Sequence, residues 1–165
     1  MKISKENWDV HEIDYDEFRD ASQELFTIGI APNYPKQYFL LSERYSGFKM
    51  LIEQSFIGLH TVPYVSFIHK SQTLLCLTDF CVVIDYKKKT VLLQQKLNTS
   101  CIDILCINDM AYIVCEADIM KYSVEDNALV KSLYLSDTVQ EITNQNGEWM
   151  IALYDGTLIT LPFSF

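Results

Sequence analysis

Cysteine is the residue type in this sequence with the widest range of possible chemistry. The five cysteines are Cys76, Cys81, Cys101, Cys106 and Cys115, and the spacing Cys-x4-Cys occurs twice among them. Thiolates could ligate zinc, but structural zinc needs ligands that converge from a tight turn, whereas residues five apart in a strand point to opposite faces. We therefore expect no metal site. Because the number is odd and no secretory signal precedes them, we expect five reduced thiols buried in strands.

Catalytic motifs are not found in the sequence. His11, His60 and His69 lie in separate segments, so no local pattern pairs a nucleophile with a base. The glycine-rich phosphate and dinucleotide loops, the His-Glu-x-x-His zinc motif and the Gly-x-Ser-x-Gly nucleophile elbow are all missing. We expect a protein that is not an enzyme, with no catalytic residues and no cofactor. An enzyme whose Cys/His or carboxylate site is assembled only in space is a third alternative.

Carboxylates recur in predicted turns at a nearly constant spacing. Asp79, Asp118 and Asp155 are 39 and 37 residues apart, and each follows an apolar run. Equivalent turns of a repeat lie at one end of the assembly, so these residues would form an acidic rim with aromatic anchors beside it. The predicted partner-binding residues are Glu43, Tyr45, Asp79, Glu116, Asp118, Tyr154 and Asp155. The alternative is that Asp is favoured in turns because it hydrogen-bonds its own backbone.

The charge distribution indicates the kind of partner. The chain carries 13 basic and 22 acidic side chains, and residues 101–165 alone have a net charge of −8. Such a chain repels nucleic acid and anionic membranes, so we expect a basic protein as the partner. Lys87, Lys88 and Lys89 reverse the charge locally, and we interpret them as the solvated tip of a hairpin. A phosphate or partner contact is the alternative role for these lysines.

Hydrophobic patterning predicts one helix followed by strands. In residues 14–26 the apolar spacing of three and four indicates an amphipathic helix, with Asp14 as its N-cap. From residue 27 onward, short runs rich in Val, Ile, Leu, Tyr, Phe and Thr end in turns, which is typical of strands. Asn146-Gly147 and Asp155-Gly156 predict two-residue hairpins with positive φ at both central positions. Two further hairpins are predicted at residues 87–89 and 125–127.

The hairpins repeat with the period of propeller blades. The four predicted repeats span residues 24–61, 62–97, 98–135 and 136–165, and each is an up-and-down meander. The last repeat lacks a fourth strand, which the N-terminal strand at residues 2–13 would supply in a closed propeller. In this spacing the chain resembles small β-propellers of the WD-repeat kind. The expected fold is mainly β, an antiparallel meander of about four blade-like repeats with one N-terminal helix. A β-sandwich or barrel is the alternative.

Chain length predicts one domain, residues 1–165, with an N-terminal segment at 1–26 and a β-repeat region at 27–165. No secretory signal or membrane-spanning apolar run is visible, which predicts a cytoplasmic protein. In size and acidity, and in lacking catalytic motifs, the chain resembles the immunity proteins that accompany bacterial toxins. That resemblance implies a binding protein that occludes a basic toxin, for example a nuclease. The alternative is a propeller-like scaffold or assembly subunit of a multiprotein complex.

Overall fold

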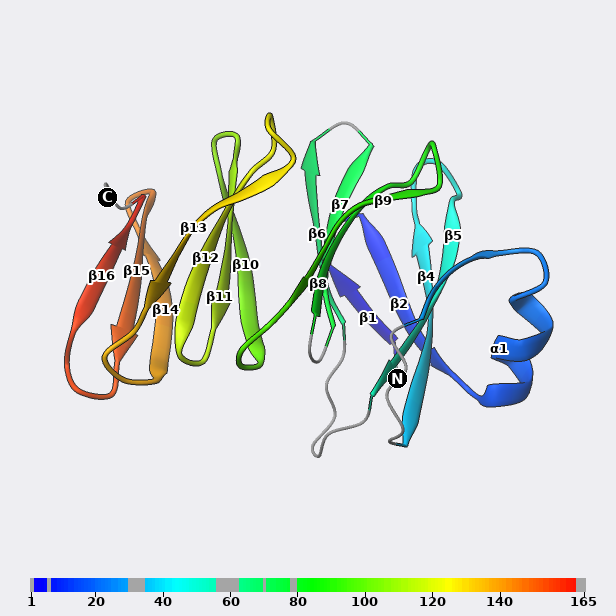
Figure 1. Cartoon of the computed structure of the whole chain (residues 1–165), viewed down its shortest axis with the longest axis horizontal. Coiled ribbons are helices and arrows are strands. Elements are labelled where there is room, and N and C mark those ends of the chain that lie inside the picture. Colours follow the sequence, from blue (N-terminus) through cyan, green and yellow to red (C-terminus); the bar gives the residue numbers. More distant parts are fainter. Residues whose placement is uncertain are drawn as a thin grey trace. The chain divides into compact units, whose positions relative to one another are not determined.

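The described residues of the chain form four β-sheets and one helix, and the chain divides into two compact units. The computed structural model describes residues 2–5, 7–29, 35–55, 63–69, 71–77 and 80–162, with the backbone alone for 2–5 and 64–69. Unit 1 comprises residues 1–96 and unit 2 residues 97–165. In Figure 1 the colour of the chain runs from blue at the N-terminus to red at the C-terminus. The prediction of a mainly β fold with one helix is confirmed.

Sheet A is the first sheet of unit 1 and the least regular. Its strand order is β1-β2-β4-β5-β3, and β3 pairs with β5 in parallel while the other pairs are antiparallel. The strands are β1 (Lys2–Lys5), β2 (Trp8–Ile13), β3 (Phe26–Gly29), β4 (Lys36–Glu43) and β5 (Lys49–Ser55). On β4, buried and half-buried residues alternate, as expected for a strand with one face on a core.

Helix α1 (Tyr15–Ala21) is shorter than the predicted residues 14–26. Its N-terminus is as predicted, because the Asp14 carboxylate accepts the Glu17 N–H at 2.9 Å and the Glu17 side chain accepts the Asp14 N–H in return. Phe18 packs on Tyr38 of β4, with ring centroids 4.6 Å apart. The helix ends early because residues 22–25 turn the chain so that Phe26 can begin β3.

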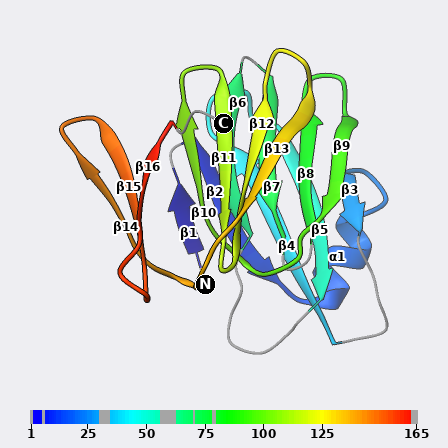
Figure 2. The same ribbon diagram turned by 60° about the vertical axis from the view of Figure 1, so that its left-hand side comes forward.

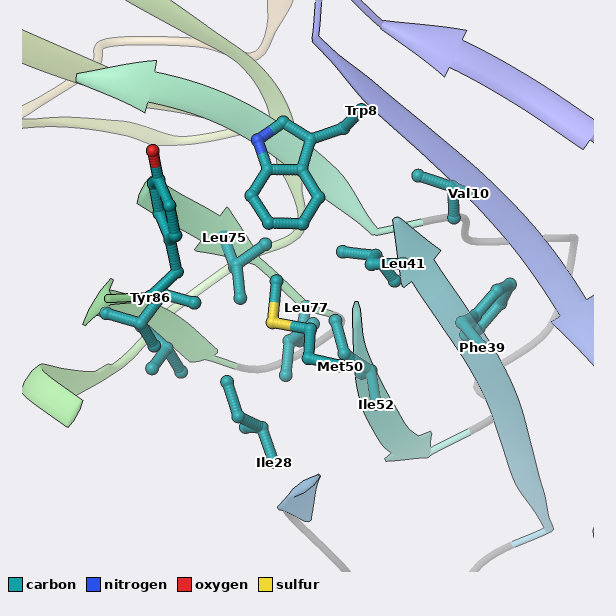
Figure 3. Packing of buried hydrophobic residues seen from close by; sticks show 12 residues of the cluster. Trp8, Val10, Ile28, Phe39, Leu41, Met50, Ile52, Leu75, Leu77 and Tyr86 are labelled. Carbon is teal, nitrogen blue, oxygen red and sulfur yellow. The ribbon is translucent and has the colours of Figure 1, made fainter. Parts of the chain in front are cut away.

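Sheet B completes unit 1 as an antiparallel meander. Its strands are β6 (Tyr64–His69), β7 (Gln72–Cys76), β8 (Phe80–Asp85) and β9 (Thr90–Lys96), paired in that order. Buried side chains of sheets A and B share one core, in which Trp8, Leu41 and Met50 meet Leu75 and Tyr86 (Figure 3). Every described residue of β8 after Phe80 is buried, which explains the unbroken apolar run Cys81–Ile84.

Unit 2 contains two further meanders. Sheet C consists of β10 (Cys101–Ile107), β11 (Met110–Cys115), β12 (Asp118–Ser123) and β13 (Ala128–Tyr134), and sheet D of β14 (Val139–Gln145), β15 (Glu148–Leu153) and β16 (Leu158–Leu161). Figure 2 shows the three strands of sheet D in orange to red. Tyr112, Val114 and Ile119 of sheet C share a core with Ile151 and Leu153 of sheet D. Trp149 is half-buried against this core, and Ile151 and Leu153, on the same face of β15, are buried in it.

The second, third and fourth predicted repeats correspond to sheets B, C and D, but the predicted first repeat is wrong. Sheet A begins at Lys2 rather than near residue 24, because β1 and β2 pair with each other and β2 then pairs with β4. The same pairing overturns the expectation that residues 2–13 complete the last repeat. Burial of Trp8 and Val10 in the core of unit 1 holds β2 in sheet A.

Three hairpins share one turn design. In the turns after β4, β8 and β12, the last strand residue accepts hydrogen bonds from backbone N–H groups two or three residues ahead, and a residue with positive φ closes the turn. The accepting residues are Glu43, Asp85 and Ser123, and the closing residues are Gly47, Lys89 and Asn127. The predicted hairpins at residues 87–89 and 125–127 are therefore confirmed, with Tyr86 and Val124 included in their turns.

The two predicted glycine turns in sheet D differ from each other. Asn146 and Gly147 both have positive φ, 54° and 90°, so this hairpin has the predicted two-residue turn. At the second turn only Gly156 has positive φ, 86°, and the loop contains three residues. Asp155 does not have a positive φ. Its carboxylate accepts the Thr157 N–H at 2.8 Å, which stabilises a type I turn that is followed by Gly156 in the left-handed region.

Candidate functional site

Three connections of unit 2 meet at one end of its two sheets, at the lower edge of Figure 1. They follow β11, β13 and β15, and backbone hydrogen bonds join them. Val139 N–H donates to the Glu116 carbonyl at 3.1 Å, and Tyr154 N–H donates to the Thr138 carbonyl at 3.1 Å. Through these bonds the structure brings together Glu116, Asp118, Tyr154 and Asp155, four of the seven predicted site residues.

Asp155 is fixed at this end by two hydrogen bonds. Its carboxylate accepts the Ser136 hydroxyl at 2.6 Å and the Thr157 N–H at 2.8 Å. These hydrogen bonds lower the pKa of Asp155 because they stabilise the charged form, and the bond from Ser136 has the largest effect. The side chain is exposed. Asp155 therefore presents a fixed negative charge to solvent at neutral pH.

Asp118 lies at the same end but is buried, with 1% of its surface exposed. Its carboxylate accepts Asn98 Nδ2 at 3.3 Å and Thr99 Oγ1 at 3.4 Å. Thr99 Oγ1 in turn accepts the Ala117 N–H at 3.2 Å. The carboxylate therefore ties the segment before β10 to the connection between β11 and β12, and it presents no surface to a partner.

An exposed acidic and aromatic surface surrounds these bonds. We call it the acidic end, and it consists of Glu116, Tyr134, Asp137, Tyr154 and Asp155. Tyr134 and Tyr154 expose 73% and 66% of their surface, which is high for large side chains. Sequence reasoning missed Tyr134 and Asp137. The link from residue 135 to residue 138, where an acidic residue again follows a strand, was the signal that could have revealed Asp137.

Glu43 and Tyr45 lie in unit 1, in the turn after β4. This turn has the design of the turns after β8 and β12, so Glu43 is equivalent to Asp85 rather than to Asp118 or Asp155. Figure 1 shows the turns after β4 and β8 at the same end of unit 1. The rings of Phe48 and Tyr86 beside these turns lie 5.5 Å apart. Glu43 therefore lies in a different kind of turn from Asp118 and Asp155, and Asp79 lies outside the described residues.

The end of unit 1 that holds Glu43 also holds the three lysines. Asp85 accepts the N–H groups of Lys87 and Lys88 at 3.1 Å each, and Lys88 Nζ lies 3.5 Å from the Asp85 carboxylate. The lysine side chains are exposed at the hairpin tip. Burial, assisted by the charges of Glu43 and Asp85, raises the pKa of Tyr86. The Asp85 carboxylate therefore stabilises the backbone of the lysine turn and also lies within ion-pair distance of Lys88.

The cysteines are placed differently from the expectation. Cys76 and Cys81 stand opposite each other on β7 and β8, so they share a face, because a turn separates them rather than a continuous strand. Cys101 stands opposite Cys115 on β11. Three cysteines are buried, but Cys101 is half-buried and Cys106 exposed, which corrects the expectation that all five are buried.

Neither a metal cluster nor a membrane-spanning helix occurs among the residues that the structure describes. Over the part of the chain that the structure describes, no group of three or more His, Cys, Asp or Glu side chains is arranged to hold a metal ion. Within the same residues, no helix is both long and apolar enough to span a membrane.

No protein-family model matches the sequence, and no curated protein matches it either. Solved structures do resemble the chain. The computationally designed Ika4 protein has a TM-score of 0.53 at 9% identity, covering 85% of this chain and 91% of its own. Sqt1 of Saccharomyces cerevisiae has a TM-score of 0.53 at 12% identity, covering 78% of this chain and 40% of its own.

A chain of the Mitotic Checkpoint Complex has a TM-score of 0.50 at 12% identity, covering 79% of this chain and 44% of its own. Sqt1 and the chain of the Mitotic Checkpoint Complex are β-propeller-like proteins. The present protein spans less than half the length of either of them. At such low identity the likeness concerns the fold alone. Among the described residues, four successive sheets, three of which are antiparallel meanders, and these neighbours together establish that the protein has a propeller-like, mainly β fold.

Proposed function

We propose that the protein is a non-enzymatic binding module that helps to assemble a multiprotein complex, and that its acidic end binds a basic surface of a partner protein. The observation that carries this proposal is the convergence of three connections of unit 2 on exposed Glu116, Asp137 and Asp155, with Tyr134 and Tyr154 among them. Carboxylates steer a basic partner toward such a surface, and tyrosines supply contact area on arrival.

The charge of unit 2 supports a basic partner rather than nucleic acid or membrane. Residues 97–165 carry ten acidic and two basic side chains, a net charge of −8, whereas residues 1–96 have a net charge of −1. Propeller-like folds among the similar structures include a chain of a protein complex, which agrees with an assembly role. We place this role in the cytoplasm, as the sequence predicts.

A toxin inhibitor would be the special case in which the basic partner is a toxin. None of the similar solved structures reported above supports that narrower reading, so the proposal is limited to complex assembly. The enzyme alternative has no observation in its favour among the described residues.

The test is affinity capture from the native host with mass spectrometry, followed by kinetics with the captured partner. Substituting Glu116→Gln, Asp137→Asn and Asp155→Asn together removes three charges, and at residue 155 it keeps one oxygen acceptor for the Thr157 N–H while the amide group replaces the oxygen that Ser136 bonds. We expect the association rate to fall at least tenfold and its salt dependence to flatten, because salt screens charges over about 8–10 Å.

The matched control removes charge from unit 1 instead of unit 2. The triple variant Lys87→Gln, Lys88→Gln, Lys89→Gln changes the same number of exposed charges at the hairpin tip of unit 1. It should bind at the wild-type rate. If the lysine variant loses the partner while the carboxylate variant keeps it, the partner engages the lysine tip and the proposal is wrong.

A further inference from the structure

Strand β16 has a free edge where its counterparts in the other meanders have a neighbour. Sheets B and C each contain four strands, and the fourth strands, β9 and β13, are seven residues long. Sheet D contains three, and among the described residues no strand pairs with the outer side of β16, drawn in red in Figure 1. In sheets B and C, strands β9 and β13 therefore occupy the position that is empty beside β16 among the described residues.

The outer edge of β16 has hydrogen-bonding groups in the right direction for such a strand. Leu153 N–H donates to the Thr157 carbonyl at 2.9 Å, and the β15–β16 register continues from that pair without a shift. In an antiparallel ladder, bonded and non-bonded pairs alternate, so Ile159 and Leu161 bond to β15. The backbone N–H and C=O groups of Leu158 and Thr160 therefore point to the free edge.

This edge also lacks most of the features that normally block strand addition. The outermost pairs of sheets B and C contain a bulge or register shift, and β9 and β13 carry lysines. The sequence of β16 is Leu-Ile-Thr-Leu, with no charge, no proline and no register shift. Natural sheets protect their edges with charges, prolines and bulges, and the protection of β16 is limited to its short length and to Pro162 directly after it.

We propose that an extended, basic segment of the partner protein adds to β16 as the fourth, antiparallel strand of sheet D. The inference rests on the proposed function and specifies how the partner binds. The segment needs an apolar residue beside half-buried Ile159, as Leu129 and Leu133 occupy half-buried positions on β13. The net charge of −8 in unit 2 selects a basic segment and disfavours a second copy of this chain.

A short edge supplies few hydrogen bonds, so the neighbouring acidic end contributes to the affinity. Asp155 and Tyr154 lie in the turn that leads directly into β16. A basic segment on β16 therefore passes these side chains as it leaves the sheet. Main-chain bonds fix the register of the segment, and the carboxylates select its charge.

The first test uses amide hydrogen exchange of the full chain with defined peptides. The probe is a heptapeptide of alternating lysine and valine, and the control peptide has glutamate in place of lysine. We expect the lysine peptide at saturation to slow exchange of the Leu158 and Thr160 amides at least tenfold, and the glutamate peptide to leave them unchanged. Absence of protection, protection at β9 or β13 instead, or equal protection by both peptides would overturn the proposal.

The second test removes one outward N–H. Thr160→Pro deletes the amide at the free edge and leaves the bonds between β15 and β16, while Thr160→Val keeps the amide. We expect Thr160→Pro to weaken peptide binding at least tenfold and Thr160→Val to bind as wild type. Unchanged binding by a folded Thr160→Pro variant contradicts strand addition. If that variant does not fold, the exchange experiment on the wild-type chain decides.

Comparison with the carboxylate variant separates the two proposals. If the triple substitution at Glu116, Asp137 and Asp155 weakens partner binding but Thr160→Pro does not, the acidic end binds the partner without strand addition. If Thr160→Pro abolishes partner binding and the triple substitution has no effect, strand addition stands and the acidic-end proposal fails.

Discussion

Single carboxylates in this protein stabilise turns by accepting hydrogen bonds from backbone N–H groups of the same turn. Glu43 is buried, and its carboxylate accepts the N–H groups of Tyr45 and Ser46. Burial alone would raise the pKa of Glu43, but the hydrogen bonds from Ser46 and Tyr45 outweigh it and hold the pKa below its usual value. The ionised form is therefore the one that stabilises the fold.

We predict that Glu43→Gln lowers the free energy of unfolding by about 1 kcal/mol at pH 7, because a neutral acceptor makes weaker bonds. The folded-state pKa lies below that of the unfolded chain, so the stabilisation is complete above about pH 4.3 and is lost as the pH falls through the folded-state value. Urea denaturation of both proteins at pH 7 and pH 3 measures this. The exposed Glu125→Gln serves as the control, and a Glu43→Gln deficit that persists undiminished at pH 3 would refute the explanation.

Thiol reactivity should follow position in the sheets. Cys106 is exposed, whereas Cys115 is buried. A hydrogen bond with Cys101 and then burial raise the pKa of the Cys115 thiol, so little thiolate is present for reaction. We predict that an aromatic disulfide reagent modifies Cys106 first and Cys115 last in the native protein. All five should react after denaturation without reductant. Equal rates for these two residues, or fewer than five reactive thiols, would contradict this.

At the scale of elements, the hairpin turns are the parts best predicted from sequence. Asn146-Gly147 and the lysine turn depend on four to six consecutive residues, so local propensity is enough to place them. The choice of pairing partner is different. Residues 2–13 read equally well as a strand for the first or the last sheet, and only burial of Trp8 and Val10 against distant side chains decides between them.

The candidate site also has features that could be predicted from local sequence and features that could not. Asp118 and Asp155 fall in matching connections, as the spacing predicts, because the repeat length is a local property of strands and turns. The exposure of these two side chains, in contrast, depends on residues that are distant in the sequence. Asp118 is buried by Asn98 and Thr99, which come from the segment before β10, and no pattern around Asp118 shows this. The turn at Glu43 lies where the sequence predicts it, but its apolar flanks do not show which kind of connection it is.

The shared turn predicts a stabilising substitution. Lys89 closes the turn after β8 with φ 53°, a conformation that costs a side chain with a Cβ about 1–2 kcal/mol. Gly47 closes the equivalent turn after β4. After the entropy of glycine in the unfolded chain is subtracted, Lys89→Gly should raise the free energy of unfolding by roughly 0.5–1 kcal/mol. Thermal and urea unfolding test this, and Lys87→Gly, without positive φ, should destabilise. Destabilisation by both variants would contradict the turn assignment.

At the scale of the molecule, charge is divided unequally. Unit 2 carries nearly all of the net charge, and the carboxylates of Asp16 and Asp20 on α1 are each paired with Arg19, at 2.9 and 3.0 Å. We predict that zero-length carbodiimide cross-links to polylysine concentrate on carboxylates of residues 97–165 at low salt and disappear in high salt. Cross-links concentrated on α1 would show that local acidity in unit 1 governs encounter instead.

The parallel strand in sheet A has a consequence for how the chain is made. In sheets B, C and D each strand pairs with its predecessor in the sequence, whereas β2 pairs with β4 and β3 pairs with β5. A ribosome releases the chain from the N-terminus, so β2 and β3 emerge well before their partners β4 and β5 have been synthesised. Loop closure must precede this pairing, which slows it relative to the hairpins that follow. The sheet that is translated first therefore exposes its apolar strands longest on the nascent chain.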